Sequence, residues 1–203
     1  MDQKEKTKKR SRAYPVFVVL LIVGALLIVS ACGMLLAKRL IDKSAIKRNE
    51  EVVERLRALW QDGEIGLLEE GEDPKMPAIE IDGVDYIGRI SVERFGADVA
   101  VTSDWNTGWT SALFCRAAGS LYDKTLVVGA NNDAGQFDFF YRVDAGDQVR
   151  FTDAEGVTYV YEVGRAARAS SFDPSAKAEA DLTLYLHNRL SMEYIVLYCN
   201  TAH

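Results

Sequence analysis

Few side chains in this 203-residue sequence could carry covalent catalysis or bind a transition metal. The sequence has three cysteines and two histidines: Cys32, Cys115, Cys199, His187 and His203. A thiolate attacks a carbonyl carbon when a nearby histidine transfers the proton, so a Cys–His pair is the first chemistry to consider. Cys32 lies in a long apolar run and His203 is the final residue, which leaves Cys115, His187 and Cys199 as the candidates within a folded domain.

Cys115 and Cys199 allow three interpretations. Two cysteines in an oxidising compartment indicate a disulfide, but they can also be two buried free thiols, or one of them can be a catalytic thiol. The spacing of the cysteines and histidines matches neither the Cys-x2-Cys nor the His-x3-His pairs of zinc sites. We therefore expect no metal site and no cofactor.

The elements that must position His187 are two predicted strands within residues 181–199, DLTLYLHNRLSMEYIVLYC. Apolar and polar side chains alternate from Leu182 to His187, which is the pattern of a strand with one buried face. After a polar connection, the β-branched and aromatic run that begins at Tyr194 predicts a second, more buried strand. His187 ends the first strand, where an exposed structural role and a catalytic role are the two alternatives.

Short apolar runs separated by turn residues continue from residue 79 to the end of the chain, a pattern typical of an all-β barrel or sandwich. Asp82-Gly83 predicts a tight hairpin turn, and Gly156 supplies a residue that tolerates positive φ in the loop 153–156. The expected strands are residues 79–81, 86–91, 99–102, 125–129, 148–152, 157–164, 181–186 and 194–199.

An uncharged apolar run at residues 16–37 precedes this domain. As an α-helix it would be about 33 Å long, enough to cross a bilayer. It is too long for the apolar core of a cleaved signal peptide, so we interpret it as a transmembrane signal anchor. The alternative is a lipoprotein signal, because Val29-Ser30-Ala31-Cys32 resembles a lipidation box with Cys32 as the modified residue. Both interpretations tether the following domain to the outer face of a membrane.

The chain thus divides into four segments. Residues 1–15 form a basic cytoplasmic tail, 16–37 the anchor, 38–78 a stalk helix and an acidic linker, and 79–203 the β domain. The stalk helix is expected over residues 44–60, with Ser44 as its N-cap and with Ile46, Val53, Leu56 and Trp60 on one face. Basic residues flank both ends of the anchor, and their distribution favours a cytoplasmic N-terminus.

The charge distribution excludes one class of partner. The formal net charge is −6, and the basic residues gather on either side of the apolar run, so the β domain itself is acidic. A nucleic-acid partner is not expected, because nothing in that domain would neutralise its phosphates.

The predicted strands carry short motifs in the order in which they occur in sortases, and the chain resembles this family over about residues 81–199. Sortases are membrane-anchored cysteine transpeptidases that attach proteins to bacterial cell walls or build pili. The resemblance implies a closed eight-stranded β-barrel with short helices. The matching segments are Tyr86-Ile87-Gly88, Val101-Thr102-Ser103-Asp104-Trp105, Leu126-Val127-Val128-Gly129-Ala130-Asn131, Ala145-Gly146-Asp147-Gln148-Val149, Gly156-Val157-Thr158-Tyr159-Val160-Tyr161-Glu162-Val163 and Thr183-Leu184-Tyr185-Leu186-His187.

The residues that carry the chemistry of that family differ here. In sortases a cysteine attacks the sorting-signal peptide to form a thioester, a histidine transfers protons, and an arginine stabilises the oxyanion. The corresponding positions of this sequence hold His187, Ala130 and Tyr194. Arg189, in the connection between the last two strands, is the arginine that could reach back to the site.

Four residues are candidates for a peptide-binding groove: Asn131, Thr183, Arg189 and Trp105. Asn131 can instead be a turn former, and Trp105 can instead pack in the core.

The resemblance without the catalytic residues predicts a catalytically silent sortase homologue at the bacterial cell membrane, with a single membrane pass and an extracytoplasmic domain. Its expected partners are a sorting-signal peptide, a pilin or another cell-envelope protein, or an active sortase. One alternative is an active transpeptidase or hydrolase with displaced catalytic groups, such as His187 as the nucleophile. A structural envelope protein is the other.

Overall fold

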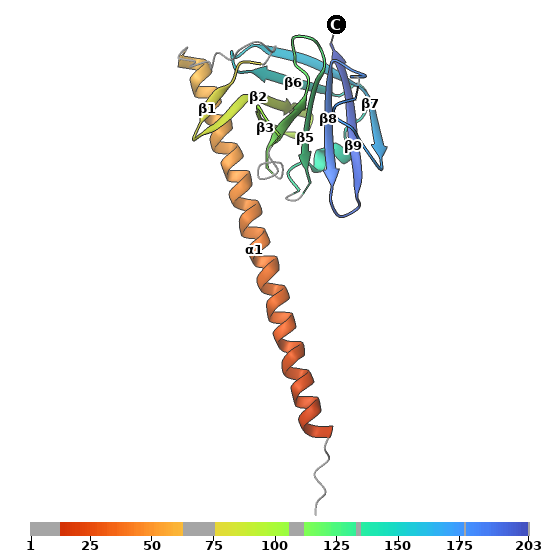
Figure 1. The fold of residues 1–203 in the computed structure, drawn as a ribbon. Coiled ribbons are helices and arrows are strands. Elements are labelled where there is room, and N and C mark those ends of the chain that lie inside the picture. Colours follow the sequence, from red (N-terminus) through yellow and green to blue (C-terminus); the bar gives the residue numbers. More distant parts are fainter. Residues whose placement is uncertain (1–12, 63–75, 106–111, 133–134, 177, 203) are drawn as a thin grey trace, which may run out of the picture. The chain divides into compact units, whose positions relative to one another are not determined.

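The computed structural model describes residues 13–62, 76–105, 112–132, 135–176 and 178–202. The chain forms two compact units, Met1–Ile41 and Asp42–His203. Helix α1, Ala13–Asp62, contributes to both of them (Figure 1). Residues 63–75, which are most of the predicted linker, and parts of three loops lie outside the described residues.

The first unit contains the apolar part of α1. Residues Phe17–Ala37 are long and apolar enough to cross a membrane, by length and composition. A signal sequence near an N-terminus would satisfy the same criterion. The residues predicted as a stalk helix are helical, but the predicted start at Ser44 is wrong, since α1 runs without a break from Ala13 to Asp62.

The C-terminal part of α1 belongs to the core of the second unit. Val53 and Leu56 are buried and Trp60 is partly buried, so the predicted apolar face does pack on the β domain. The Trp60 indole donates a hydrogen bond to the Ala154 carbonyl (3.1 Å). The cluster consists of Val52, Val53, Leu56, Ile79, Ile81, Tyr86, Ala100, Ala112, Leu113 and Ala154.

Asn49 joins this helix to the barrel through hydrogen bonds to the backbone of residues 98 and 100. Its side-chain amide donates to the Asp98 carbonyl (2.9 Å) and accepts from the Ala100 N–H (2.9 Å), and the residue is buried. Asn49→Ala leaves both backbone groups without this partner, so we expect a loss of about 1–3 kcal/mol in the free energy of unfolding. Thermal unfolding of the full chain in detergent, followed by near-UV circular dichroism, measures it. Glu50→Ala, at the exposed neighbour, is the control; an equal effect of both variants would contradict the prediction.

In the described residues, the β domain is a closed barrel of eight strands with a ninth strand outside it. The strands pair in the order β2-β3-β4-β5-β8-β9-β7-β6, and β6 pairs back with β2, which closes the barrel; β1 pairs only with β2. The predicted closed eight-stranded barrel is therefore confirmed. The strands are β1 Ile79–Ile81, β2 Val84–Val92, β3 Ala97–Thr102, β4 Phe114–Ala118, β5 Leu126–Asn131, β6 Gln148–Asp153, β7 Thr158–Ala169, β8 Leu182–Asn188 and β9 Glu193–Thr201.

The eight predicted strands are not the eight of the barrel. The sequence predicts β1, which lies outside the closed sheet, and misses β4, Phe114–Ala118. The β4 sequence FCRAA has an arginine and two alanines, which favour a strand only weakly. It is extended because β3 pairs with it on one side, in parallel, and β5 on the other, antiparallel.

The residues that the sequence predicts to form turns, and those that it predicts to face the inside of the domain, do so in the structure. Asp82 and Gly83 both have positive φ (52° and 75°), as a two-residue hairpin turn requires, and Gly156 has φ 83°. Leu182, Leu184 and Leu186 belong to the main core inside the barrel. The predicted short helices are two 3-10 turns, η1 Glu93–Phe95 and η2 Asp138–Tyr141.

Candidate functional site

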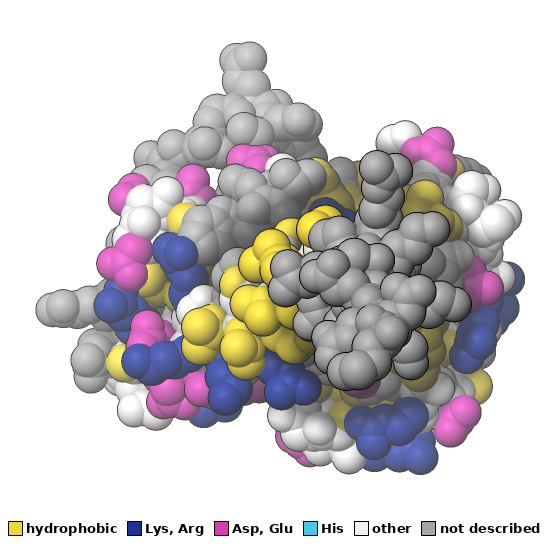
Figure 2. All heavy atoms as spheres, turned by 90° about the horizontal axis from the view of Figure 1, so that it is seen from below, with side chains coloured by type: hydrophobic (Ala, Val, Ile, Leu, Met, Phe, Trp, Pro, Cys, Tyr) yellow, Lys and Arg dark blue, Asp and Glu magenta, His cyan; other side chains and the backbone are white. Residues whose placement is uncertain are grey.

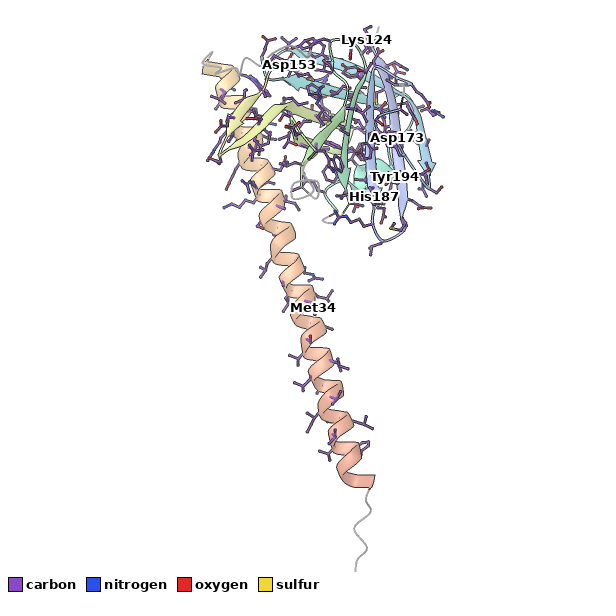
Figure 3. All side chains as sticks on the ribbon, in the orientation of Figure 1. Met34, Lys124, Asp153, Asp173, His187 and Tyr194 are labelled. Carbon is purple, nitrogen blue, oxygen red and sulfur yellow. The ribbon has the colours of Figure 1, made fainter. Side chains whose placement is uncertain are left out.

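Three of the predicted site residues lie in one row across β5, β8 and β9. In the parallel pair β5–β8 Asn131 is opposite His187, and in the antiparallel pair β8–β9 His187 is opposite Tyr194. The His187 ring stacks on the Tyr194 ring, with centroids 4.5 Å apart and planes 14° from parallel; both are labelled at the same end of the barrel in Figure 3. The two positions that the sequence matches to the family's nucleophile and arginine are therefore neighbours.

Ala130 lies inside the barrel instead. It pairs with Leu186, has no exposed surface and belongs to the main core. Successive strand residues face opposite sides of a sheet, so Asn131, and not Ala130, shares the outer face with His187. Matching the Gly-His-Asn motif residue by residue selects Ala130, whereas the cross-strand register selects Asn131, which is buried.

Aromatic side chains cover the outer face beside this row. The Tyr185 ring stacks on Trp105 (centroids 5.7 Å, planes 15°) and contacts Phe172 (4.8 Å) and Tyr194 (6.3 Å). We call Trp105, Phe172, Tyr185, His187 and Tyr194 the outer aromatic cluster. Burial raises the pKa of the Tyr185 phenol, so this group stays neutral and is no general base near neutral pH.

The cluster lies directly on the sheet. A Cβ atom built on Gly129 would be 2.2 Å from the Tyr185 ring, so the ring lies against the backbone of β5. Trp105 is 39% exposed and stacks on Tyr185, so it is not a core residue, and its peptide contact stays a prediction. Phe172 was missed by sequence reasoning, because it lies between β7 and β8 in a segment without strand periodicity.

The two cysteines of the barrel are buried, and neither is part of a disulfide. Cys115 lies on β4 and Cys199 on β9, and β5 and β8 separate the two strands. Strand spacings of about 4.8 Å then hold their Cα atoms farther apart than the roughly 7 Å limit for a disulfide. The structure thus corrects the disulfide prediction. Burial raises the pKa of the Cys199 thiol to about 12, so it carries almost no thiolate at neutral pH and is a poor nucleophile.

The remaining candidates lie apart from the row. Thr183 is buried on β8 opposite Val127 and Tyr198, four residues before His187. Arg189 lies in the exposed turn after β8. Of the four predicted groove residues, the structure therefore brings Asn131 and Trp105 to the outer aromatic cluster and leaves Thr183 and Arg189 on either side of it.

Comparison with known proteins finds solved structures with a similar fold, and it finds no protein related in sequence. No protein-family model matches the chain, and no curated protein matches it. Among solved structures it is similar to a sortase D5 transpeptidase of Clostridium perfringens (TM-score 0.50, 11% identity, 80% of this chain and 99% of that one).

Two further sortases have the same architecture. Sortase C1 of Streptococcus agalactiae superposes with a TM-score of 0.52 at 12% identity, over 61% of this chain and 71% of that one. Clostridium perfringens sortase C, solved with the C-terminal cell wall sorting motif, superposes with a TM-score of 0.50 at 12% identity, over 79% and 89%. The barrel closure, the strand order and these superpositions agree, and the chain has the sortase fold.

Proposed function

We propose that the protein is a membrane-anchored, extracytoplasmic sortase homologue that binds a peptide or protein partner without forming a covalent intermediate. The nucleophile position holds His187, whose ring is stacked on Tyr194, and the residue matched to the catalytic histidine is buried Ala130. The barrel cysteines are both buried, which argues against either of them as a replacement nucleophile. These features together support binding rather than thioester chemistry.

The observation that carries the proposal is the outer aromatic cluster, which occupies the face where Asn131, His187 and Tyr194 lie in one row. Aromatic faces bind extended peptides by packing against aliphatic and proline side chains, and they need no charged ligand. One sortase of the same fold was solved with a cell wall sorting motif. The partner we propose is therefore a sorting-signal peptide or a segment of a pilin; an active sortase would present its own surface to the same cluster.

Trp105→Ala should weaken binding of a sorting-signal peptide at least about tenfold, equivalent to about 1.4 kcal/mol, since exposed tryptophans anchor such contacts. Fluorescence anisotropy with a panel of labelled sorting-signal and pilin peptides, titrated with the full chain in detergent, measures the affinity. Tyr122→Ala is the control, because Tyr122 is an exposed aromatic residue in the turn before β5, away from the cluster. Equal affinities for the two variants would contradict the assigned binding face.

Intact-mass analysis of the same mixtures separates a binder from an enzyme. The proposal expects no adduct. If His187 acts as a nucleophile, an acyl adduct will appear in the wild type and disappear in His187→Ala, and the catalytic alternative would then replace the proposal. A protein that binds none of the peptides and forms no adduct would support the structural alternative.

A further inference from the structure

Strand β7 continues beyond the point where its neighbour on one side ends. β6 pairs with residues 158–162 of β7, whereas β9 pairs with residues 161–169, with a one-residue shift in register after Val163. The chain before β6 follows β7 only as far as Val163, through two backbone hydrogen bonds of 2.8 and 2.9 Å. Figure 1 shows β7 as the outermost strand on one side of the barrel. Among the described residues, the stretch 165–169 therefore has a sheet neighbour on one side only, and we call it the open edge of β7.

The strand pairing determines which backbone groups of β7 point to the open side. The N–H and C=O groups of alternate residues point to opposite sides of a strand. The Ala202 N–H bonds to the Val160 carbonyl on β7 (2.9 Å), whereas the Thr201 N–H bonds to the Asp181 carboxylate just before β8 (3.0 Å). The even-numbered residues at this end of the chain therefore direct their backbone groups to β7, and the same alternation continues along β9.

Two residues of β7 consequently present their backbone to the open side. The register pairs residues 165, 167 and 169 with even-numbered residues of β9, so the N–H and C=O groups of Ala166 and Arg168 point away from β9. Both residues are exposed, and no group of the described residues bonds to these two N–H and two C=O groups. Such a row of unsatisfied backbone groups is a template for an added strand.

Two arginines determine which kind of strand the open edge accepts. Arg165 is ion-paired with Glu179 (2.6 Å), whereas Arg168 lies 6.0 Å from the centre of the Tyr141 ring and has no carboxylate partner among the described residues. A second copy of this chain would bring the same two cations to the edge, which disfavours self-pairing. A strand with an acidic side chain beside Arg168 would instead form an opposite-charge pair. Figure 2, seen from below, shows Lys and Arg side chains together with acidic ones along the side of the barrel at which Figure 1 draws β7.

The open edge belongs to the same sheet surface as the outer aromatic cluster. Ala167 pairs with Val196 and Ala169 with Tyr194, and paired residues of antiparallel strands have their side chains on the same face. An added strand would lie about 10 Å from β9, which is two strand spacings. Only the methyl groups of the two alanines would separate its side chains from Tyr194. Its alternate side chains would therefore face either the aromatic cluster or Arg168.

We propose that an extended segment of the partner binds to the open edge of β7 as an additional β-strand. Its backbone bonds to Ala166 and Arg168, its apolar side chains lie on the face of the outer aromatic cluster, and an acidic side chain lies beside Arg168. The inference deepens the proposed function and rests on it, because the segment belongs to the same peptide or pilin partner. In this mode of binding the main chain supplies affinity, and alternate side chains supply selectivity.

The test measures amide hydrogen exchange by NMR on the full chain in detergent. The probes are the sorting-signal and pilin peptides of the panel and two short designed peptides of alternating valine and threonine, one with a glutamate and the other with a lysine at its centre. We expect a bound peptide to slow exchange at the Ala166 and Arg168 amides at least about tenfold. The Ala167 amide is the internal control, because it faces β9 in the free chain and should change less.

Two variants test the backbone contact and the charge contact separately. Ala166→Pro removes an N–H group that has no partner in the free chain, so the thermal midpoint should change little while peptide binding weakens at least about tenfold. The glutamate peptide should bind the wild type about threefold or more tighter than the lysine peptide, and Arg168→Glu should reverse this order. Arg55→Glu is the matched control and should keep it, since Arg55 is an exposed arginine of α1 that pairs with Asp82 (2.7 Å).

The outcomes separate this inference from the proposed function. Panel peptides that bind without slowing exchange at residues 166 and 168 would overturn the added strand and leave the proposed function intact. Absence of binding by every peptide would overturn both. Slow exchange at the two amides without peptide, increasing with protein concentration, would show a second copy at the edge and overturn the inference. A preference for glutamate that survives Arg168→Glu would overturn the acidic contact.

Discussion

Ala130→His should destabilise the barrel by about 3 kcal/mol, although Ala130 is the position that matches the catalytic histidine of sortases. Ala130 has no exposed surface and is packed among the apolar side chains inside the barrel. An imidazole there overpacks the core and buries a polar ring that has no hydrogen-bond partner. Each of these two effects lowers the free energy of unfolding by about a few kcal/mol or less. Chemical denaturation of the full chain in detergent measures the loss.

Ala166→His is the matched control, because Ala166 is an exposed residue of strand β7. It should change the free energy of unfolding by less than about 0.5 kcal/mol, as substitutions at exposed sites usually do. Similar losses in the two variants would mean that position 130 is not in the core.

The pairing of β5, β8 and β9 determines which positions would have to be substituted to bring the catalytic groups of sortases together in this chain. Asn131, His187 and Tyr194 form the cross-strand row on the outer face. A variant that combines Asn131→His, His187→Cys and Tyr194→Arg would place all three groups in this row, whereas one that uses Ala130→His would place the imidazole on the other side of the sheet. The residue-by-residue motif match is therefore a poor guide to restoring catalysis in this chain.

Gly129→Ala is the second variant with a large expected effect, a loss of about 2 kcal/mol, in the range found for overpacked sites. Its new methyl group would lie 2.2–2.6 Å from the ring carbons of Tyr185, which can move only by leaving the outer aromatic cluster. The loss should appear in thermal unfolding and in a changed near-UV circular dichroism signal from the stacked Trp105 and Tyr185.

A double-mutant cycle isolates the cause of this loss. In a Tyr185→Ala background the added methyl has space, so Gly129→Ala should become neutral, and the two substitutions should be non-additive. Gly164→Ala is the control, since its methyl would meet the end of the Asn200 side chain at 3.2 Å and the Tyr198 carbonyl oxygen at 3.6 Å, an ordinary contact distance. Additive effects of the substitutions at 129 and 185 would show that the ring does not lie on Gly129.

Features that depend on neighbours in sequence could be predicted from the sequence. The alternation of Leu182, Leu184 and Leu186 sets which face of β8 is buried, because side chains alternate along any strand. The Asp82-Gly83 turn and the apolar run at Phe17–Ala37 are likewise local properties of residue type. The order of short motifs along the chain was enough to predict the sortase fold, which the barrel and its structural relatives confirm.

The tertiary structure decided the features that depend on pairing between distant segments. Strand β4 is extended because β3 and β5 enclose it, and its own residues favour a strand only weakly. The register of β5 against β8 decides that Asn131 rather than Ala130 lies beside His187, since a one-residue shift exchanges the two faces of a strand. The outer aromatic cluster gathers residues from two loops and two strands, and Cys115 and Cys199 are buried on separate strands. No local pattern specifies these contacts, because they form only when the sheet closes.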